Sequence, residues 1–333
     1  MRKIRWGVLG VARIATSKVI AAMQQGEVTE IAAIASRDLA KAQAAASELA
    51  IPKAYGSYEE LLADPEIDAI YNPLPNHLHV PWSIRAAEAG KHVLCEKPIG
   101  LNAAQARELI AARDRTGVVI GEAFMIVCHP QWIRAIALAR SGRIGTLRAA
   151  IGSFAYFNPD ASNVRNVLEY GGGGLMDVGC YPIKASRMFF GEEPVRVSGT
   201  LVRDPNFQTD LLASGLLEFP SGHGIFTCGT QVVPNQSMKF LGTKGSIEFE
   251  IPFNAIRGRA SHIRINDGSD LLGAGITVEE FPPCDQYTLQ GDQFSRAILE
   301  HTPPPVPLED ALKNMQVIES LFRAAQTGTV VDL

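Results

Sequence analysis

The stretch "IRWGVLGVARIA", residues 4–15, decides the fold class of the first half of the chain. Its first six residues form an apolar run typical of a strand, Gly10 then marks a tight turn, and a helix is predicted from Arg13 to Gln24. The segment Gly10–Ala15 fits G-x-A-x-x-A, a variant of the glycine-rich turn that binds pyrophosphate at a helix N-terminus. Ala12 stands at the middle position, where the motif usually has glycine. Its one extra methyl group keeps the backbone slightly farther from a pyrophosphate.

The same rhythm of strand and helix continues to about residue 122. We expect strands at 4–9, 30–35, 69–72, 92–95 and 118–121, with helices at 13–24, 39–49, 57–63, 80–89 and 103–116. Ser57 with Glu60 predicts a capping box, and Asn102 predicts an N-cap. Alternation at this spacing predicts a parallel sheet with helices on both faces, a doubly wound α/β domain.

Beyond residue 123 the rhythm changes. One helix at 131–141 precedes consecutive strand-like segments at 147–157, 195–201, 212–219, 224–232, 238–242 and 246–251, and two helices close the chain. This predicts an α+β domain with an open, largely antiparallel sheet, so we expect domains at 1–122 and 123–333. A broad sheet face with few covering helices predicts a homodimer through that face.

Composition excludes several classes of function. The 333 residues are 46% apolar and 20% charged with a net charge of −4, which argues against nucleic acid or an anionic membrane as the main partner. No apolar stretch approaches a membrane span, and glycines with Arg13 interrupt any signal peptide. Five cysteines without paired spacing predict reduced thiols and a cytoplasmic protein rather than disulfides or zinc.

The second predicted strand ends in "AIASRD", residues 33–38, and indicates the type of dinucleotide. An acidic residue at its tip would bind a ribose 2′-hydroxyl, whereas Arg37 can pair with a 2′-phosphate and Ser36 can donate to it. Lys41 adds positive charge. The pattern predicts NADP rather than NAD, the alternative being an exposed loop arginine.

The loop "YNPLPNHLH", residues 71–79, follows the next strand at the edge where doubly wound sheets bind ligands. We expect Asn72, Pro73, Asn76 and His77 to support the ribose and nicotinamide. Two histidines without a nearby carboxylate or cysteine do not predict a metal site.

Two further motifs carry ionisable groups. In "HVLCEKPIG", residues 92–100, Lys97 stands at a strand end before a proline that restricts its backbone, and the Lys97–Pro98 bond is a candidate for cis. A surface lysine paired with Glu96 is the alternative. In "GGGGLMDVGCY", residues 171–181, Asp177 and Tyr181 are four apart where a helix begins and share one face. The glycines let backbone approach a ligand or form a flexible loop.

Together, "GVARIA", "SRD", "PNHLH", "EKP" and "GGGGLMDVGCY" resemble the glucose–fructose oxidoreductase, inositol dehydrogenase and rhizopine-catabolism (Gfo/Idh/MocA) family over essentially the whole chain. The resemblance implies an N-terminal Rossmann domain and hydride transfer between nicotinamide and a sugar-like carbon. Many relatives carry histidine where this chain has Tyr181, so it looks like the tyrosine-bearing branch, which includes aldose–aldose oxidoreductase, dimeric dihydrodiol dehydrogenase and xylose dehydrogenase.

The resemblance also implies site roles. Tyr181 would be the general acid/base, Lys97 its electrostatic partner, and Asp177 a binder of a substrate hydroxyl. Because an ordinary phenol has a pKa of about 10, the tyrosine needs the nearby ammonium to act at neutral pH. The expected cofactor-binding set is Gly10, Ala12, Arg13, Ile14, Ser36, Arg37, Lys41, Asn72, Pro73, Asn76, His77, Glu96, Lys97 and Glu122. The expected substrate-binding set is Met125, Arg148, Phe154, Asp177, Tyr181 and Arg203, although Arg148 and Arg203 are equally well read as solvated strand charges.

The leading interpretation is therefore an NADP-dependent oxidoreductase of an aldose or cyclic polyol, with aldose–aldose oxidoreduction on a retained cofactor as one form of it. A trans-dihydrodiol dehydrogenase or dicarbonyl reductase is the alternative within the enzymes. A non-catalytic NADP-sensing regulator is the alternative outside them.

Overall fold

The computed structural model describes residues 2–333, which divide into two compact units. The first unit comprises residues 2–128 and 285–312, and the second comprises 129–284 and 313–333. The predicted boundary after residue 122 therefore lies six residues early, and the segment 285–312 was predicted in the wrong domain. The physical reason is helix α8 (Gln286–Glu300), where Phe294 packs on Trp6 with ring centroids 5.6 Å apart and Ser295 Oγ accepts from the Trp6 indole at 3.1 Å.

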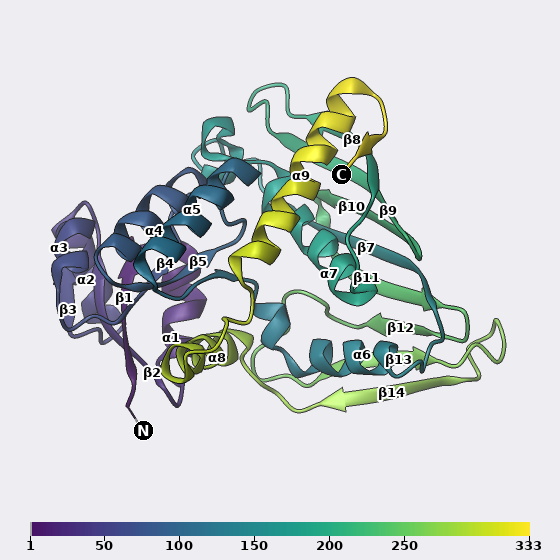
Figure 1. Ribbon diagram of the computed structural model, residues 1–333, viewed down its shortest axis with the longest axis horizontal. Coiled ribbons are helices and arrows are strands. Elements are labelled where there is room, and N and C mark those ends of the chain that lie inside the picture. Colours follow the sequence, from purple (N-terminus) through teal and green to yellow (C-terminus); the bar gives the residue numbers. More distant parts are fainter. Residues whose placement is uncertain (1) are drawn as a thin grey trace. The chain divides into compact units, whose positions relative to one another are not determined.

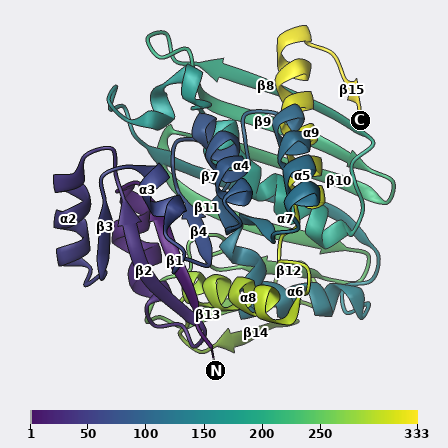
Figure 2. The same ribbon diagram turned by 60° about the vertical axis from the view of Figure 1, so that its left-hand side comes forward.

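The first unit is built on a six-stranded parallel sheet in the order β3-β2-β1-β4-β5-β6. Helices α4 (His79–Glu88) and α5 (Ala103–Thr116) lie side by side, and so do α1 (Ile20–Met23) and α8 (Figures 1 and 2). The strand order extends from β1 in both directions, which is the doubly wound arrangement that the sequence predicted. The strands are β1 (Ile4–Leu9), β2 (Thr29–Ala35), β3 (Lys53–Tyr55), β4 (Ala69–Asn72), β5 (His92–Glu96) and β6 (Ile120–Ala123).

The helices of this unit follow the predicted pattern with local differences. The predicted helix after Gly10 contains a π-helical turn, η1 (Ala15–Val19), before α1 (Ile20–Met23). Ser57 Oγ accepts from the Glu60 amide at 3.1 Å, but the Glu60 carboxylate accepts from Gly56 rather than from Ser57, so only half of the capping box forms. The remaining helices are α2 (Leu39–Glu48), α3 (Tyr58–Ala63), η2 (Asn76–Leu78), α4 (His79–Glu88), α5 (Ala103–Thr116) and η3 (Met125–Cys128).

The second unit is built on a nine-stranded sheet in the order β14-β13-β12-β11-β7-β10-β9-β8-β15. Among the described strand pairs of this second sheet, β10–β7 is the parallel one and the others are antiparallel, which confirms the predicted open, largely antiparallel sheet. The strands are β7 (Leu147–Phe157), β8 (Arg196–Arg203), β9 (Asp210–Phe219), β10 (Gly222–Gly229), β11 (Gln231–Gly242), β12 (Ser246–Phe249), β13 (Ser261–Asn266), β14 (Ile276–Phe281) and β15 (Val331–Asp332).

One face of this sheet is covered by helices and holds the core of the second unit. Helices α6 (Pro130–Arg140) and α7 (Cys180–Phe190) pack on it, and α9 (Leu308–Thr327) begins in the first unit and ends in the second (Figure 1). Short turns η4 (Val164–Asn166), η5 (Leu168–Tyr170) and the π-helical η6 (Leu175–Gly179) precede α7. Trp132 stacks on Phe249 with ring centroids 4.1 Å apart, and Phe189 stacks on Phe240.

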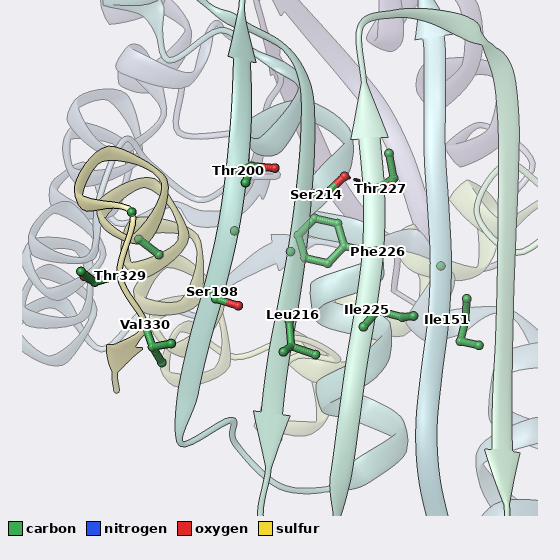
Figure 3. A pocket seen from close by; sticks show the side chains of 15 residues that line it. Ile151, Ser198, Thr200, Ser214, Leu216, Ile225, Phe226, Thr227, Thr329 and Val330 are labelled. Carbon is green, nitrogen blue, oxygen red and sulfur yellow. Dashed lines mark hydrogen bonds between the residues drawn. The ribbon is translucent and has the colours of Figure 1, made fainter.

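The opposite face presents its side chains in continuous cross-strand rows. Leu216, Ile225 and Ile151 are register partners on three adjacent strands. A parallel row of hydroxyls is formed by Thr200, Ser214, Thr227, Ser153 and Ser237. Part of both rows lines a shallow hollow of about 580 Å³, in which Ser214 and Thr227 hydrogen-bond at 3.0 Å (Figure 3).

Candidate active site

The carboxyl edge of the parallel sheet gathers the predicted dinucleotide motifs. All six strands run in one direction, and β1 lies next to β4 at the point where the connections change direction. Doubly wound sheets bind ligands at this switch point. The loops that end there carry Gly10 after β1, Arg37 after β2, Asn76 after β4 and Lys97 after β5.

The turn after β1 requires glycine. Gly10 has φ +80°, and a Cβ at this position would lie 2.9 Å from Leu74 Cδ2. Its amide donates to Ala35 O at 2.7 Å, which ties the turn to the end of β2. Ala12, Arg13 and Ile14 then lead into the helix, where Ala12 O accepts from the Thr16 amide at 3.0 Å. A close backbone turn before a helix start fits a dinucleotide pyrophosphate.

The tip of β2 presents cationic side chains. Arg37 and Lys41 are exposed, whereas the neighbouring Asp38 accepts from the Lys41 amide as the N-cap of α2. Ser36 Oγ accepts from the Asp38 amide at 3.2 Å. The nearby carboxylate is therefore engaged with the helix, and the exposed guanidinium and ammonium fit a 2′-phosphate.

The structure corrects the expectation for Asn72 in the loop after β4. Its side chain is fully buried, where Nδ2 donates to His79 O at 3.0 Å and to Ser83 Oγ at 3.1 Å. Burial of an amide is favourable only with such partners, so the Asn72 side chain braces the loop rather than being free for a ligand. Pro73 is buried too, whereas Asn76 and His77 remain half-buried.

The turn that carries Lys97 is fixed by two carboxylates. Glu96 Oε1 accepts from Tyr71 Oη at 2.7 Å, and Glu96 Oε2 accepts from the Lys97 amide at 3.3 Å. Glu122 is buried, and its Oε1 accepts from the Ile99 amide at 2.8 Å. The Lys97–Pro98 peptide bond is cis, as the sequence suggested.

His79 joins this turn to the loop after β4. Its Nδ1 lies 2.8 Å from Pro98 O and its Nε2 lies 2.6 Å from Leu74 O. Burial, the largest effect, lowers the pKa of His79 to about 4, the neighbouring Lys97 and His77 lower it further, and the two carbonyls oppose the shift. The His79 ring thus links the "PNHLH" loop to the "EKP" turn through hydrogen bonds.

In the second unit, Asp177 and Tyr181 stand on successive turns of η6 and α7. Asp177 Oδ2 accepts from Tyr156 Oη at 2.6 Å and from Arg165 Nε at 2.8 Å. Burial and then the Asp177 charge raise the pKa of Tyr156 far above its usual range, so its phenol stays a donor. Sequence reasoning missed Tyr156 and Arg165. The alternation within 147–157, which places Tyr156 on the face of Phe154, was the available signal.

An aromatic cluster holds Tyr181 in place. Its side chain is 5% exposed and packs on Phe154 in an edge contact, with ring centroids 5.2 Å apart, and on Phe253 at 5.3 Å. Such contacts leave a tyrosine few rotamers, as a proton-transfer group requires. Phe154, expected to bind substrate, is itself buried behind this ring.

The glycine run packs around a buried carboxylate that sequence reasoning missed. Gly173 has φ +115°, and a Cβ there would collide with Asp210 Oδ1. Asp210 Oδ2 accepts from the Leu175 amide at 2.6 Å, and burial raises the pKa of Asp210 to about 6. Neither predicted role, close approach of a ligand or a flexible loop, is needed to explain Gly173.

Comparison with known proteins agrees with this two-part arrangement. Residues 4–124 match the model of the GFO/IDH/MocA oxidoreductase family with its NAD-binding Rossmann fold, and residues 132–248 match the GFO/IDH/MocA C-terminal domain. The chain is 46% identical over 329 residues to an uncharacterised oxidoreductase, ORF334, of Rhizobium meliloti, with 98% of each chain covered.

The chain belongs to the GFO/IDH/MocA oxidoreductase family.

Two further family members are similar over their whole length. The D-xylose 1-dehydrogenase (NADP(+)) 2 of Haloferax volcanii is 38% identical, covering 98% of this chain and 99% of that protein. The crystal structure of aldose–aldose oxidoreductase from Caulobacter crescentus, complexed with glycerol, superimposes with a TM-score of 0.91 at 29% identity, covering 100% of both chains.

The remaining expected substrate residues are Arg148, Arg203 and Met125. Arg148 donates to Ser221 O at 2.9 Å, and six residues of extended strand, about 20 Å, separate it from Phe154. Its contact with substrate stays a prediction. Arg203 donates to Gln208 O at 2.7 Å and is the register partner of Asp210. Met125 is buried in η3 of the first unit.

The described part of the chain, residues 2–333, lacks two other kinds of feature. Within this range, no group of three or more histidine, cysteine, aspartate or glutamate side chains is arranged to hold a metal ion. No helix within it combines the length and apolar character needed to cross a membrane.

Proposed function

We propose that this family member is an NADP-dependent oxidoreductase that transfers a hydride between nicotinamide and a carbon of an aldose or cyclic polyol. The named activities of the Haloferax and Caulobacter relatives support the substrate class. The observation that carries the cofactor assignment is the β2 tip, where Arg37 and Lys41 are exposed while Asp38 is engaged as a helix cap.

NADP would be held by the Gly10 turn and the β2 tip, and it supplies the hydride acceptor or donor when bound. Tyr181 takes the hydroxyl proton during oxidation and returns it during reduction. The Lys97 ammonium stabilises the negative charge that develops on the substrate oxygen. Asp177, held by Tyr156 and Arg165, accepts from a neighbouring substrate hydroxyl.

Substitution of the two proposed acid–base residues tests this mechanism. We expect Tyr181→Phe and Lys97→Met each to lower kcat by roughly 10²- to 10⁴-fold, with the Kd for NADP little changed in Tyr181→Phe. The double variant should lose less than the product of the two single losses, because the residues act as a unit. Tyr55→Phe and Lys313→Met are matched controls outside the site. Full turnover in Tyr181→Phe, or additive losses, contradicts the pair.

Substrate class is tested by absorbance of the reduced nicotinamide. Purified protein is mixed with NADP and, separately, aldoses, cyclic polyols and a trans-dihydrodiol. In a separate incubation without added cofactor, oxidation of one aldose together with reduction of another identifies aldose–aldose oxidoreduction. Turnover of the dihydrodiol alone supports the alternative enzyme class. Tight NADP binding without turnover of any compound supports a regulator and refutes our proposal.

We also propose that the uncovered sheet face binds a second copy of this chain. The apolar row of Leu216, Ile225 and Ile151 continues in register into Lys239 and Glu248, which pair at 3.5 Å. A face with both signs of charge beside an apolar centre can complement itself across a twofold axis. Ile225→Lys should convert a dimer to a monomer in sedimentation experiments, and a monomeric parent protein refutes this.

A further inference from the structure

The loop between β12 and β13 is tied to helix α6 by two side chains. Residues 250–260 form this loop and contain neither helix nor strand. Gln131 Nε2 donates to Ile251 O at 3.0 Å. The neighbouring Trp132 Nε1 donates to Pro252 O at 2.7 Å. Both donors come from the first turn of α6, so the start of the loop is anchored to that helix.

Gln236 on β11 fixes the next two residues of the loop. Its Oε1 accepts from the Phe253 amide at 3.0 Å and from the Asn254 amide at 2.9 Å. A side-chain amide oxygen has two lone pairs, so both are used here. Backbone groups outside helices and sheets need such partners when they leave water. Together with the two contacts from α6, Gln236 ties four consecutive loop residues to side chains.

The tied loop places the Phe253 ring against Tyr181. Phe253 is 0% exposed, and its ring centroid lies 5.3 Å from that of Tyr181. Phe253 also stacks on Phe154 at 5.0 Å, and Phe154 meets Tyr181 edge-on. Two rings therefore pack against the tyrosine. Phe154 belongs to β7 and is held by the strand ladder, whereas the position of Phe253 depends on the loop backbone and hence on Gln236.

We infer that Gln236 positions Tyr181 for proton transfer by holding the loop backbone at Phe253 and Asn254. This rests on the proposed acid–base role of Tyr181, and it adds a residue that none of the quoted sequence motifs contains. Without the two hydrogen bonds the Phe253 ring can shift, and a displacement of about 1 Å near a reacting group can cost roughly 100-fold in rate. Gln236 is a positioning residue, since it acts through Phe253.

Substitutions on β11 test this role in the full-length protein. Turnover is measured with NADP and D-xylose, or with whichever aldose or polyol of the substrate panel is oxidised fastest. Gln236→Met removes the acceptor at similar side-chain length. We expect it to lower kcat by roughly ten- to 100-fold, with KM and the Kd for NADP within about twofold of the parent. Gln236→Glu keeps an acceptor oxygen and should restore kcat to within about threefold.

The matched control lies on the same strand. Gln231 Nε2 donates to Asp204 Oδ2 at 2.7 Å, so Gln231→Met also removes a side-chain hydrogen bond from β11. It should leave kcat unchanged. Tryptophan emission adds a readout that needs no turnover. Because the Trp132 indole donates to the same loop, Gln236→Met should shift the emission to the red as water reaches the ring, and Gln231→Met should not.

A double variant shows whether the effect passes through Tyr181. In a Tyr181→Phe background, Gln236→Met should lower the residual rate by less than about twofold, because the group that it positions is absent. Unchanged kcat in Gln236→Met, or an equal loss with and without the Tyr181 hydroxyl, overturns the role of Gln236 and leaves the acid–base proposal intact.

Full turnover in Tyr181→Phe refutes the acid–base proposal instead, and the role of Gln236 falls with it. Should Gln236→Met fold poorly, Gln236→Asn replaces it. This variant withdraws the oxygen by one methylene group and should lower kcat selectively but less. An unchanged kcat in Gln236→Asn then overturns the role of Gln236.

Discussion

Asp210→Asn should stabilise the second unit, and only at neutral and alkaline pH. The carboxyl is buried beneath the glycine run, and burial raises its pKa from 3.8 to about 6. A raised carboxyl pKa contributes stability that is fully present below pH 3.8 and is lost as pH rises through 6. A shift of about two units corresponds to roughly 3 kcal/mol of unfolding free energy at pH 8. Asparagine removes the charge and keeps an oxygen for the Leu175 amide.

Calorimetric unfolding at pH 4 and pH 8 tests this reasoning. At pH 4 the Asp210 carboxyl is protonated in the folded parent, so the difference in unfolding free energy between variant and parent reflects the substitution alone. At pH 8 that difference should shift by about 3 kcal/mol in favour of the variant. For a unit of this size the shift in Tm is roughly 6–12 °C. Asp64→Asn is the control, since hydrogen bonds from Lys53 and Tyr55 overcome burial and lower its pKa to about 2, so its titration window lies below pH 4 and its difference from the parent should change little between pH 4 and pH 8. A pH-independent difference for Asp210→Asn refutes the buried-charge explanation.

Three further outcomes follow from the same contacts. The first unit should lose stability as pH falls from 6.5 toward 4, because burial lowers the pKa of His79 to about 4, and calorimetry of His79→Gln should show a smaller acid loss. Gly173→Ala should destabilise the second unit by roughly 1–3 kcal/mol or more in urea unfolding, since its φ is +115° and Asp210 blocks the new methyl. Tyr156→Phe should raise the KM for the sugar more than it lowers kcat, because it loosens Asp177 without removing it.

The local order of strands and helices was readable from the sequence because it depends on near neighbours. Strand β7 was predicted with its observed bounds, since apolar residues recur through its eleven positions. Helix α8 was assigned to the wrong unit because Phe294 and Ser295 find their partner, Trp6, almost three hundred residues away. Periodicity carries no information on such a contact.

The candidate site likewise contains residues that the sequence indicates and residues that only the folded structure reveals. Lys97 and Tyr181 stand out because an ionisable group beside a proline or at a helix start is unusual in sequence. Asn72 looked like a ligand group because the loop around it is polar, yet its amide is satisfied within the protein by His79 and Ser83. Asp210 has no motif of its own, and only the folded sheet brings it beneath the glycine run.

The return of residues 285–312 to the first unit governs the order in which the chain can mature during synthesis. The nascent amino-terminal segment leaves the ribosome with Trp6 lacking its helical cover, and more than 150 residues must be translated before that cover exists. Residues 129–284, which lie between the two parts of the first unit, can therefore fold while the first unit is still incomplete. The first unit of this family member, which holds the Rossmann fold, is therefore complete only after residue 312 has been synthesised.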